Sequence, residues 1–165
     1  MGVMEGGVET LFREAMATLC SGVAVVTGTT PEDGRPCGLV ATSVSSFSAD
    51  PPSVLVSIAH SSRCHQALTE GDGFGVHVLA ADQEPVANVF AGLGEDKFAG
   101  LAWRYDGGVP RLAGTLSFLR CRRSAVFELY DHTLLVGDVV AGAFERGEPL
   151  VYMSRSMAWR LEPIG

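Results

Sequence analysis

Short apolar runs of strand length recur along this sequence, and most of them follow one another through turn residues. The runs cover residues 23–27, 36–47, 54–58, 74–79, 115–129, 132–144 and 149–153. Three other segments, 9–20, 61–68 and 82–92, have the apolar spacing or the capping residues of helices. Because strands and helices do not alternate regularly, the pattern argues against a doubly wound parallel sheet. We therefore expect a mainly β protein, a predominantly antiparallel barrel with a few short peripheral helices.

The length and composition are those of one folded domain. The chain has 165 residues, of which 47% are apolar and 19% charged, so disorder is excluded as its general state. An apolar residue at every fourth position from Leu11 to Leu19 predicts a helix with one apolar stripe over 9–20. The stretch 95–111 has no clean period, and we expect a long ordered loop there. No linker or repeat divides the sequence, so we treat 1–165 as a single domain.

The charge balance limits the partners. Twelve Lys and Arg residues face 19 Asp and Glu residues, which gives a net charge of −7 and no general attraction for nucleic acid or anionic membranes. The first residues lack the regions of a signal peptide, Gly6 stands where a myristoylation signal needs Ser or Thr, and no apolar run is long enough to span a bilayer. The four cysteines form no CxxC pair, and we expect reduced thiols in a cytoplasmic protein.

Familiar nucleotide, hydrolase and metal motifs are missing. The glycines of Gly71–Gly75 do not have GxGxxG spacing, and neither a GxxxxGK[ST] loop nor a GxSxG elbow is present. His60, Cys64 and His65 are potential metal ligands, but Arg63 among them repels a cation and no second ligand pair lies nearby. We therefore expect no bound metal. A dinucleotide would have to bind without a Rossmann or P-loop phosphate-binding loop.

Three polar segments could bind a ligand, and each also has an ordinary structural explanation. The run 42–48 is rich in Ser and Thr, which would let a planar ligand approach the backbone, but a polar edge strand has the same composition. Ser61 or Ser62 with Arg63 at a helix start suits a phosphate, or simply an N-cap and a surface arginine. Asp82 likewise could cap the next helix. The corner 130–133 contains a histidine that is either functional or solvated.

Taken together and in order, these segments resemble the flavin reductase-like family, the small NAD(P)H:flavin oxidoreductases. The resemblance covers about residues 12–153, and its matching pieces are 22–27, 38–48, Asp50-Pro51-Pro52, 54–58, Phe90-Ala91, Asp96-Lys97-Phe98, Asp131-His132-Thr133 and 149–152. Each piece is weak alone, but the ordered set is fairly specific. The family has the FMN-binding split β-barrel fold of Greek-key type with a few short peripheral helices, and we expect that fold here.

The resemblance also implies where the cofactors bind. It assigns flavin contacts to Thr42, Ser43, Val44, Ser46, Ser57, Ile58, Ser62, Arg63, Lys97 and Phe98. Within this set Ser62 and Arg63 would hold the phosphate, and His132 would lie on the nicotinamide side. Two positions depart from the family pattern: Tyr130 replaces the usual glycine before Asp131-His132, and Val40 replaces a common threonine. The first departure puts the shape and the use of the nicotinamide pocket in question.

The implied activity is reduction of FMN or FAD by NADH or NADPH, with hydride transfer to flavin N5 and no protein nucleophile. By the same resemblance we expect a homodimer that supplies reduced flavin to a flavin-dependent monooxygenase, with neither nucleic acid nor membrane as partner. The alternative is a flavin-binding split barrel without reductase activity, with an oxidase-like, storage or haem-handling role.

Overall fold

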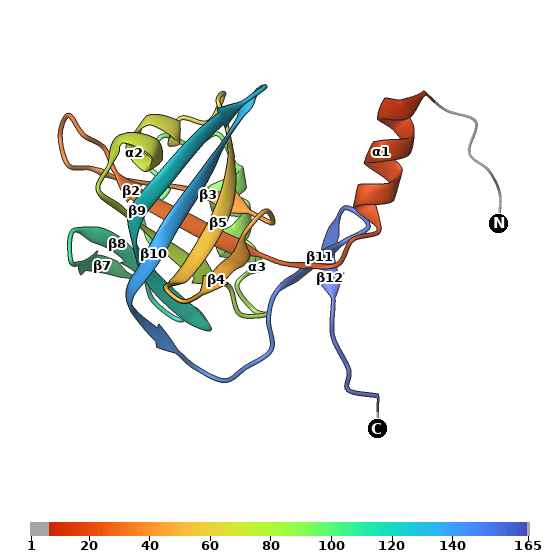
Figure 1. Cartoon of the computed structure of the whole chain (residues 1–165). Coiled ribbons are helices and arrows are strands. Elements are labelled where there is room, and N and C mark those ends of the chain that lie inside the picture. The colour runs from red at the N-terminus through yellow and green to blue at the C-terminus, as the bar shows by residue number, and fades with distance from the viewer. Residues whose placement is uncertain (1–6, 165) are drawn as a thin grey trace.

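The computed structural model describes residues 7–164, and within them twelve strands and three short helices (Figure 1). The segment that includes Gly6, for which the sequence predicts neither a signal peptide nor acylation, lies outside the described residues. None of the three described helices is long and apolar enough to cross a bilayer.

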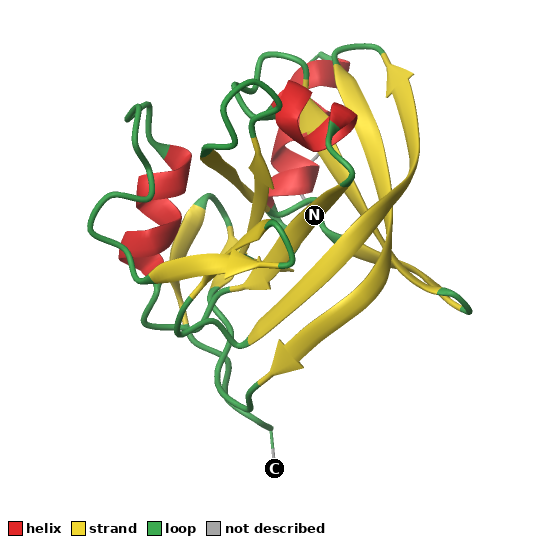
Figure 2. Ribbon diagram, turned by 90° about the vertical axis from the view of Figure 1, so that its left-hand side faces the viewer, coloured by secondary structure: helices red, strands yellow, loops and turns green. Residues whose placement is uncertain are grey.

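Seven strands form one antiparallel sheet, which confirms the expectation of a mainly β, antiparallel fold (Figure 2). Their order across the sheet is β3-β2-β6-β9-β10-β5-β4. Their bounds are β2 Ala24–Thr29, β3 Pro36–Ala41, β4 Ser45–Ala49, β5 Pro52–Ala59, β6 Gly73–Val78, β9 Ser117–Leu129 and β10 His132–Phe144. Strand β6 lies beside β2 and strand β5 lies beside β10, so neighbouring strands are not always consecutive in sequence. The segments that connect consecutive strands therefore cross over the ends of the sheet.

The two edges of this sheet are joined directly to each other. Strands β3 and β4 are at opposite edges, yet only residues 42–44 separate them in sequence. Three residues reach about 14 Å between the strand ends at most, so the sheet must curl until its edges approach each other. The result is a barrel that is split between β3 and β4. The single strand predicted over 36–47 is therefore wrong, because the chain leaves one edge at Ala41 and enters the other at Ser45.

Strand β2 separates two hydrophobic cores. Ala24 and Val26 belong to the cluster inside the barrel, whereas Val25 belongs to a second cluster on the outer face, with Phe90 and Leu150. Successive strand residues point to opposite faces, so alternate positions of one buried strand supply both cores. The outer cluster lies under helix α3 (Glu84–Ala91). Helix α2 (His65–Glu70) packs on the barrel through Leu68, whose Cδ2 would be 2.9 Å from a Cβ at Gly28.

Both predicted helix caps are wrong. Helix α2 begins at His65, after a turn in which the Ser62 hydroxyl accepts a hydrogen bond from the Cys64 N–H. Helix α3 is preceded by Gln83 rather than Asp82, and the Gln83 side chain accepts the N–H of Ala80. In both cases the polar side chain accepts a hydrogen bond from a backbone N–H outside the helix. It therefore stabilises the turn that precedes the helix.

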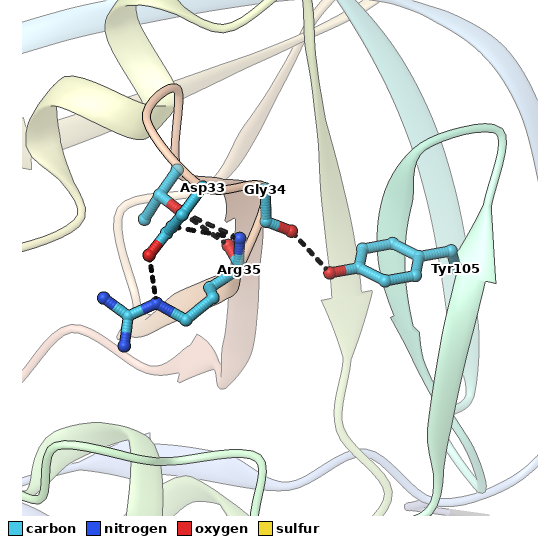
Figure 3. A network of polar contacts seen from close by, with 5 residues as sticks. Asp33, Gly34, Arg35 and Tyr105 are labelled. Atoms are coloured by element: carbon cyan, nitrogen blue, oxygen red, sulfur yellow. Dashed lines mark hydrogen bonds and ion pairs between the residues drawn. The ribbon is translucent and has the colours of Figure 1, made fainter.

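The predicted loop 95–111 contains a hairpin of β7 (Trp103–Asp106) and β8 (Val109–Leu112), which sequence analysis missed. Gly107 and Gly108 both have positive φ (57° and 83°), as a type I′ turn requires. The hairpin is fastened to the turn between β2 and β3, where the Tyr105 hydroxyl donates to the Gly34 carbonyl at 2.8 Å (Figure 3). Asp33 and Arg35 form an ion pair in the same turn (Figure 3).

The N-terminal helix stands away from the barrel (Figure 1). Helix α1 (Val8–Ala17) joins a small sheet of β1 (Ser21–Gly22), β11 (Val151–Met153) and β12 (Ser156–Trp159), where the Ser154 N–H donates to the Ala17 carbonyl at 2.7 Å. The helix ends three residues before the predicted Cys20, and β12 was not predicted. No residue of α1 is buried, so its predicted apolar stripe, which includes Leu11, is exposed in the single chain.

Candidate functional site

The predicted site lies at the end of the barrel where β5 finishes and β10 begins. The two strands are paired in register, Ser57 with Leu134 and Ala59 with His132. The chain then turns at His60, whose N–H donates to the Asp131 carbonyl at 2.9 Å. This pairing brings the predicted nicotinamide residue His132 beside the predicted flavin residues at the end of β5.

Residues 42–44, which link β3 to β4 across the split of the barrel, contact the same end of β5. The Ser43 hydroxyl donates to the Ser57 carbonyl at 3.0 Å, which ties residues 42–44 to β5. Thr42 and Ser43 are exposed, and their backbone groups belong to neither edge strand. Ser46, by contrast, lies within β4 opposite Val54. The hydroxyl-rich run is thus partly an edge strand and partly a short link with exposed backbone groups that a planar ligand can approach.

Two cations gather at the C-terminal end of α3. One guanidinium nitrogen of Arg63 donates to the carbonyls of Leu93 and Gly94, both at 2.9 Å. The Lys97 ammonium group donates to the Phe90 carbonyl at 2.6 Å. Burial lowers the pKa of Lys97, with a further contribution from Arg63. The carbonyl end of a helix attracts positive charge, so α3 holds Arg63, a predicted phosphate contact, close to Lys97, a predicted flavin contact. Ser62, the other predicted phosphate contact, precedes Arg63 in the turn before α2.

Two predicted residues contribute no exposed side chain. Ile58 is buried in the core inside the barrel, and Phe98 is buried in the outer core, packed edge to face against Phe90 and Trp103. These two can offer a ligand backbone groups only. Val44 is half-buried and packs against the core inside the barrel.

The corner that carries His132 is a two-residue turn with a strained first position. Tyr130 has φ of 56°, in the left-handed region that glycine adopts freely, and its side chain is 91% exposed. The physical requirement for a glycine-like backbone therefore remains although the residue is a tyrosine. Asp131 lies 2.8 Å from Nδ1 of His132, and this hydrogen bond lowers the pKa of the carboxyl group.

A pair of thiols lies next to the two cations, and sequence reasoning missed it. The hydrogen bond from the Cys37 thiol lowers the pKa of Cys64 to about 7, against the opposing effect of burial, and Lys97 and Arg63 lower it further. The same interaction raises the pKa of Cys37. Cys37 is on β3 and Cys64 immediately follows Arg63, so the residues are 27 positions apart with no local motif to pair them.

The two histidines considered as potential metal ligands both contact the same hydroxyl group. His60 and His65 both direct Nε2 at the Thr133 hydroxyl, and Thr133 is fully buried. Two surface pockets lie elsewhere: one of 340 Å³ between β8 and the end of β10, and one of 450 Å³ beside the β7–β8 turn. Neither is lined by a predicted flavin residue, so both pockets lie outside the candidate site at the rim of the barrel.

Known proteins resemble this chain over most of its length. It is 44% identical over 142 residues to the FMN reductase (NADH) SmoA of Agrobacterium fabrum, covering 86% of this chain and 80% of that protein. It superposes on the styrene monooxygenase flavin reductase of Pseudomonas putida with a TM-score of 0.80 at 33% identity, over 88% and 94% of the two chains. The NADH:FAD oxidoreductase of Streptomyces globisporus, solved with NAD and FAD fragments, gives 0.86 at 30% identity, over 94% of each chain.

The domain match agrees with these likenesses. Residues 16–159 match the flavin reductase like domain, and this region includes every predicted flavin residue and His132. The resemblance drawn from the short motifs is thereby confirmed. The chain belongs to the flavin reductase-like family.

Proposed function

We propose that this protein is an NADH-dependent flavin reductase that acts on FMN or FAD at the rim of the barrel. The observation that supports this most is the convergence of the link 42–44, the end of β5, the Arg63–Lys97 pair and His132 at one end of the sheet. The similarity to NADH-dependent FMN and FAD reductases supports the choice of cofactors. When bound, the flavin would supply the hydride acceptor and NADH the hydride.

The donor set fits a phosphorylated planar ligand. Exposed backbone groups at 42–44 can bond the edge of a ring system, while the Ser62 hydroxyl and the Arg63 guanidinium suit a phosphate group. Lys97 adds a second positive charge beside Arg63. A chain with net charge −7 needs such locally placed cations to hold an anion.

His132 would orient the nicotinamide. Its ring is about half exposed and is fixed by Asp131, which accepts a hydrogen bond from Nδ1 and leaves Nε2 free for a ligand. No side chain in this arrangement has to act as nucleophile or base, since hydride transfer needs orientation and a suitable polarity.

We further propose a homodimer. Helix α1 exposes Leu11, Phe12 and Met16 on one stripe and buries nothing in the single chain. An apolar stripe of this kind is the usual mark of a protein interface, and a second copy would cover it. The predicted single domain and the cytoplasmic location remain predictions from the sequence.

Reduced flavin would be delivered to a separate flavin-dependent monooxygenase. The likeness to the reductase of styrene monooxygenase supports this role. The exposure of Thr42 and Ser43 also suits a flavin that leaves after reduction. The alternative of a flavin-binding barrel without reductase activity rests on Tyr130, which replaces the usual glycine and is exposed at the corner that carries His132.

The test is NADH oxidation followed at 340 nm with FMN, FAD or riboflavin added, and NADPH in parallel. We expect flavin-dependent turnover with NADH and an absorbance spectrum that shows flavin bound at micromolar concentrations. Flavin binding without turnover by either nucleotide would favour the alternative, and failure to bind any flavin would reject both.

A further inference from the structure

The hydroxyl group of Thr133 joins two histidines. Thr133 Oγ1 lies 3.1 Å from Nε2 of His60 and 2.8 Å from Nε2 of His65. The two rings are edge to face with their centroids 5.1 Å apart, and Thr133 has no exposed surface. A buried hydroxyl shared by two imidazoles is therefore a built feature of this end of the barrel.

The hydroxyl can satisfy both rings in only a few protonation states. It has one hydrogen to donate and lone pairs with which to accept, so it donates to one Nε2 and accepts from the N–H of the other. One Nε2 therefore carries a hydrogen and the other does not, and the same hydroxyl fixes both rings.

These three residues come from three elements that meet at the candidate site. His60 follows β5, His65 begins α2, and Thr133 is the second residue of β10. The Ser62–Arg63 turn is enclosed between the two histidines, and His132 immediately precedes Thr133. A shift of either ring therefore moves the turn relative to the corner that carries His132.

We propose that Thr133 is a positioning residue, which through His60 and His65 holds the Ser62–Arg63 turn and the Asp131–His132 corner in one arrangement. The effect of Thr133 on ligands rests on the proposed flavin reductase function, but its effect on the turn and the corner does not.

Several charged groups lie on the elements around this pair. Arg63 lies between the two histidines on the turn, and Glu70 ends α2. Asp131 and His132 form the corner, and Glu128 of β9 is opposite Thr133. Positive charge at His60 helps to lower the pKa of the Asp131 carboxyl group.

The first experiment compares the backbone amide NMR spectra of the unchanged protein, Thr133→Ser and Thr133→Val without ligand. We expect the amide signals of Ser62, Arg63 and His132 to keep their positions in Thr133→Ser, which retains the hydroxyl, and to shift in Thr133→Val. Signals of the Ser62–Arg63 turn that stay in place in Thr133→Val would overturn the proposal, whether or not the protein binds flavin.

The second experiment measures dissociation constants for FMN and riboflavin together with the KM for NADH. Loss of a shared buried hydroxyl in Thr133→Val should weaken FMN binding by about tenfold and raise the KM for NADH several-fold, with less effect on riboflavin. Thr133→Ser should remain within about twofold of the unchanged protein. Equal losses in the Ser and Val variants would overturn the positioning role.

Thr27→Val is the matched control. Thr27 is equally buried, and its hydroxyl donates to the Pro110 carbonyl at 2.6 Å, away from the candidate site. This variant should lose thermal stability but keep flavin affinity and the amide signals of the Ser62–Arg63 turn. If Thr133→Val does not fold, His65→Gln tests the same link. If the unchanged protein binds no flavin, the proposed function fails, while the NMR comparison still decides the positioning role.

Discussion

The Ser43 hydroxyl donates a hydrogen bond of 3.0 Å to the carbonyl oxygen of Ser57. This single contact fastens the short link between the two edge strands to the end of β5. It joins positions 14 apart in the sequence across the split of the barrel, at the place where flavin contacts are predicted. The shape of the link is therefore set by a side chain, and the shape determines which backbone groups a ring system meets.

Ser43→Ala should loosen the link. We expect a loss of about 1 kcal/mol in the free energy of unfolding, and weaker binding of FMN and riboflavin by similar factors, because the contact concerns the ring system that both share. Ser48→Ala is the control, since its hydroxyl bonds only within the neighbouring turn to Asp50. Fluorescence quenching titrations measure both ligands; an effect confined to FMN would contradict this assignment.

Arg63→Ala should distinguish flavins by their phosphate. Loss of a charge-assisted contact should weaken FMN binding by about 10- to 100-fold and leave riboflavin within about threefold. Arg35→Ala removes another exposed guanidinium, paired with Asp33 in the distant turn, and should change neither affinity. Isothermal titration calorimetry with both ligands provides the measurement, and a parallel loss for riboflavin would indicate a structural role for Arg63.

His132→Ala should separate the two substrates. We expect the KM for NADH to rise by about tenfold through loss of one ligand hydrogen bond, with the FMN dissociation constant nearly unchanged. His132→Asn, which keeps a donor on a shorter side chain, should recover part of the loss. Steady-state kinetics at saturating FMN give the KM, and an unaltered value would exclude a contact with the nicotinamide nucleotide.

His77 should make the fold sensitive to acid. Burial lowers its pKa to about 4 with a smaller contribution from Arg111, and outweighs the hydrogen bond to the Val25 carbonyl at 3.1 Å, which raises it. Nε2 accepts the Leu112 N–H at 3.1 Å. The folded state thus binds fewer protons than the unfolded state, where the pKa is 6.5. Stability is complete above pH 6.5 and falls between 6.5 and 4, by up to about 3 kcal/mol from this residue.

Urea unfolding across this pH range measures the effect of His77. His77→Gln should be less stable at pH 7 but should show a flatter dependence on pH, because the titrating group is gone. Equal slopes for the two proteins between pH 6.5 and 4 would show that other groups cause the acid sensitivity.

Cys64 should react as a thiolate near neutral pH. In a Cys20→Ser background, which removes the exposed thiol, its alkylation by iodoacetamide should rise with pH to a midpoint of about 7. Cys37→Ala removes the donor and should move the midpoint upward. Cys121→Ala removes a buried thiol whose pKa burial raises to about 12, and should leave the midpoint in place. Mass spectrometry of the Cys64 peptide gives the rates.

Local patterns predicted the elements whose signals are local. The first long strand ends at Leu129 and the second begins at His132, as the turn residues between them indicated, and β5 begins at Pro52, the last residue of the Asp50-Pro51-Pro52 segment. The break at 42–44 has no such signal, because it arises from closure of the sheet onto itself. The β7–β8 hairpin was missed although Gly107 and Gly108 marked its turn, since its strands lack alternation.

The same distinction between local and long-range signals applies to the candidate site. Residue types at Arg63, Lys97 and His132 indicated charge and hydrogen bonding from the sequence, but their partners are set by the fold. The carbonyls of Leu93 and Gly94 lie 30 and 31 positions from Arg63, and Thr133 lies 73 positions from His60. Contacts between residues so far apart in sequence produce no periodic pattern. The sequence therefore indicated which residues are involved but not how they are arranged.

The carbonyl partners of Arg63 and Lys97 have a consequence for how a ligand is held. These bonds use only part of the hydrogen-bonding capacity of the two cations, since a guanidinium has five N–H donors and an ammonium three. A phosphate can therefore bind the remaining donors while the carbonyls at the end of α3 keep their bonds. Both cations are thus held in place before a ligand arrives, so less side-chain entropy is lost when it binds.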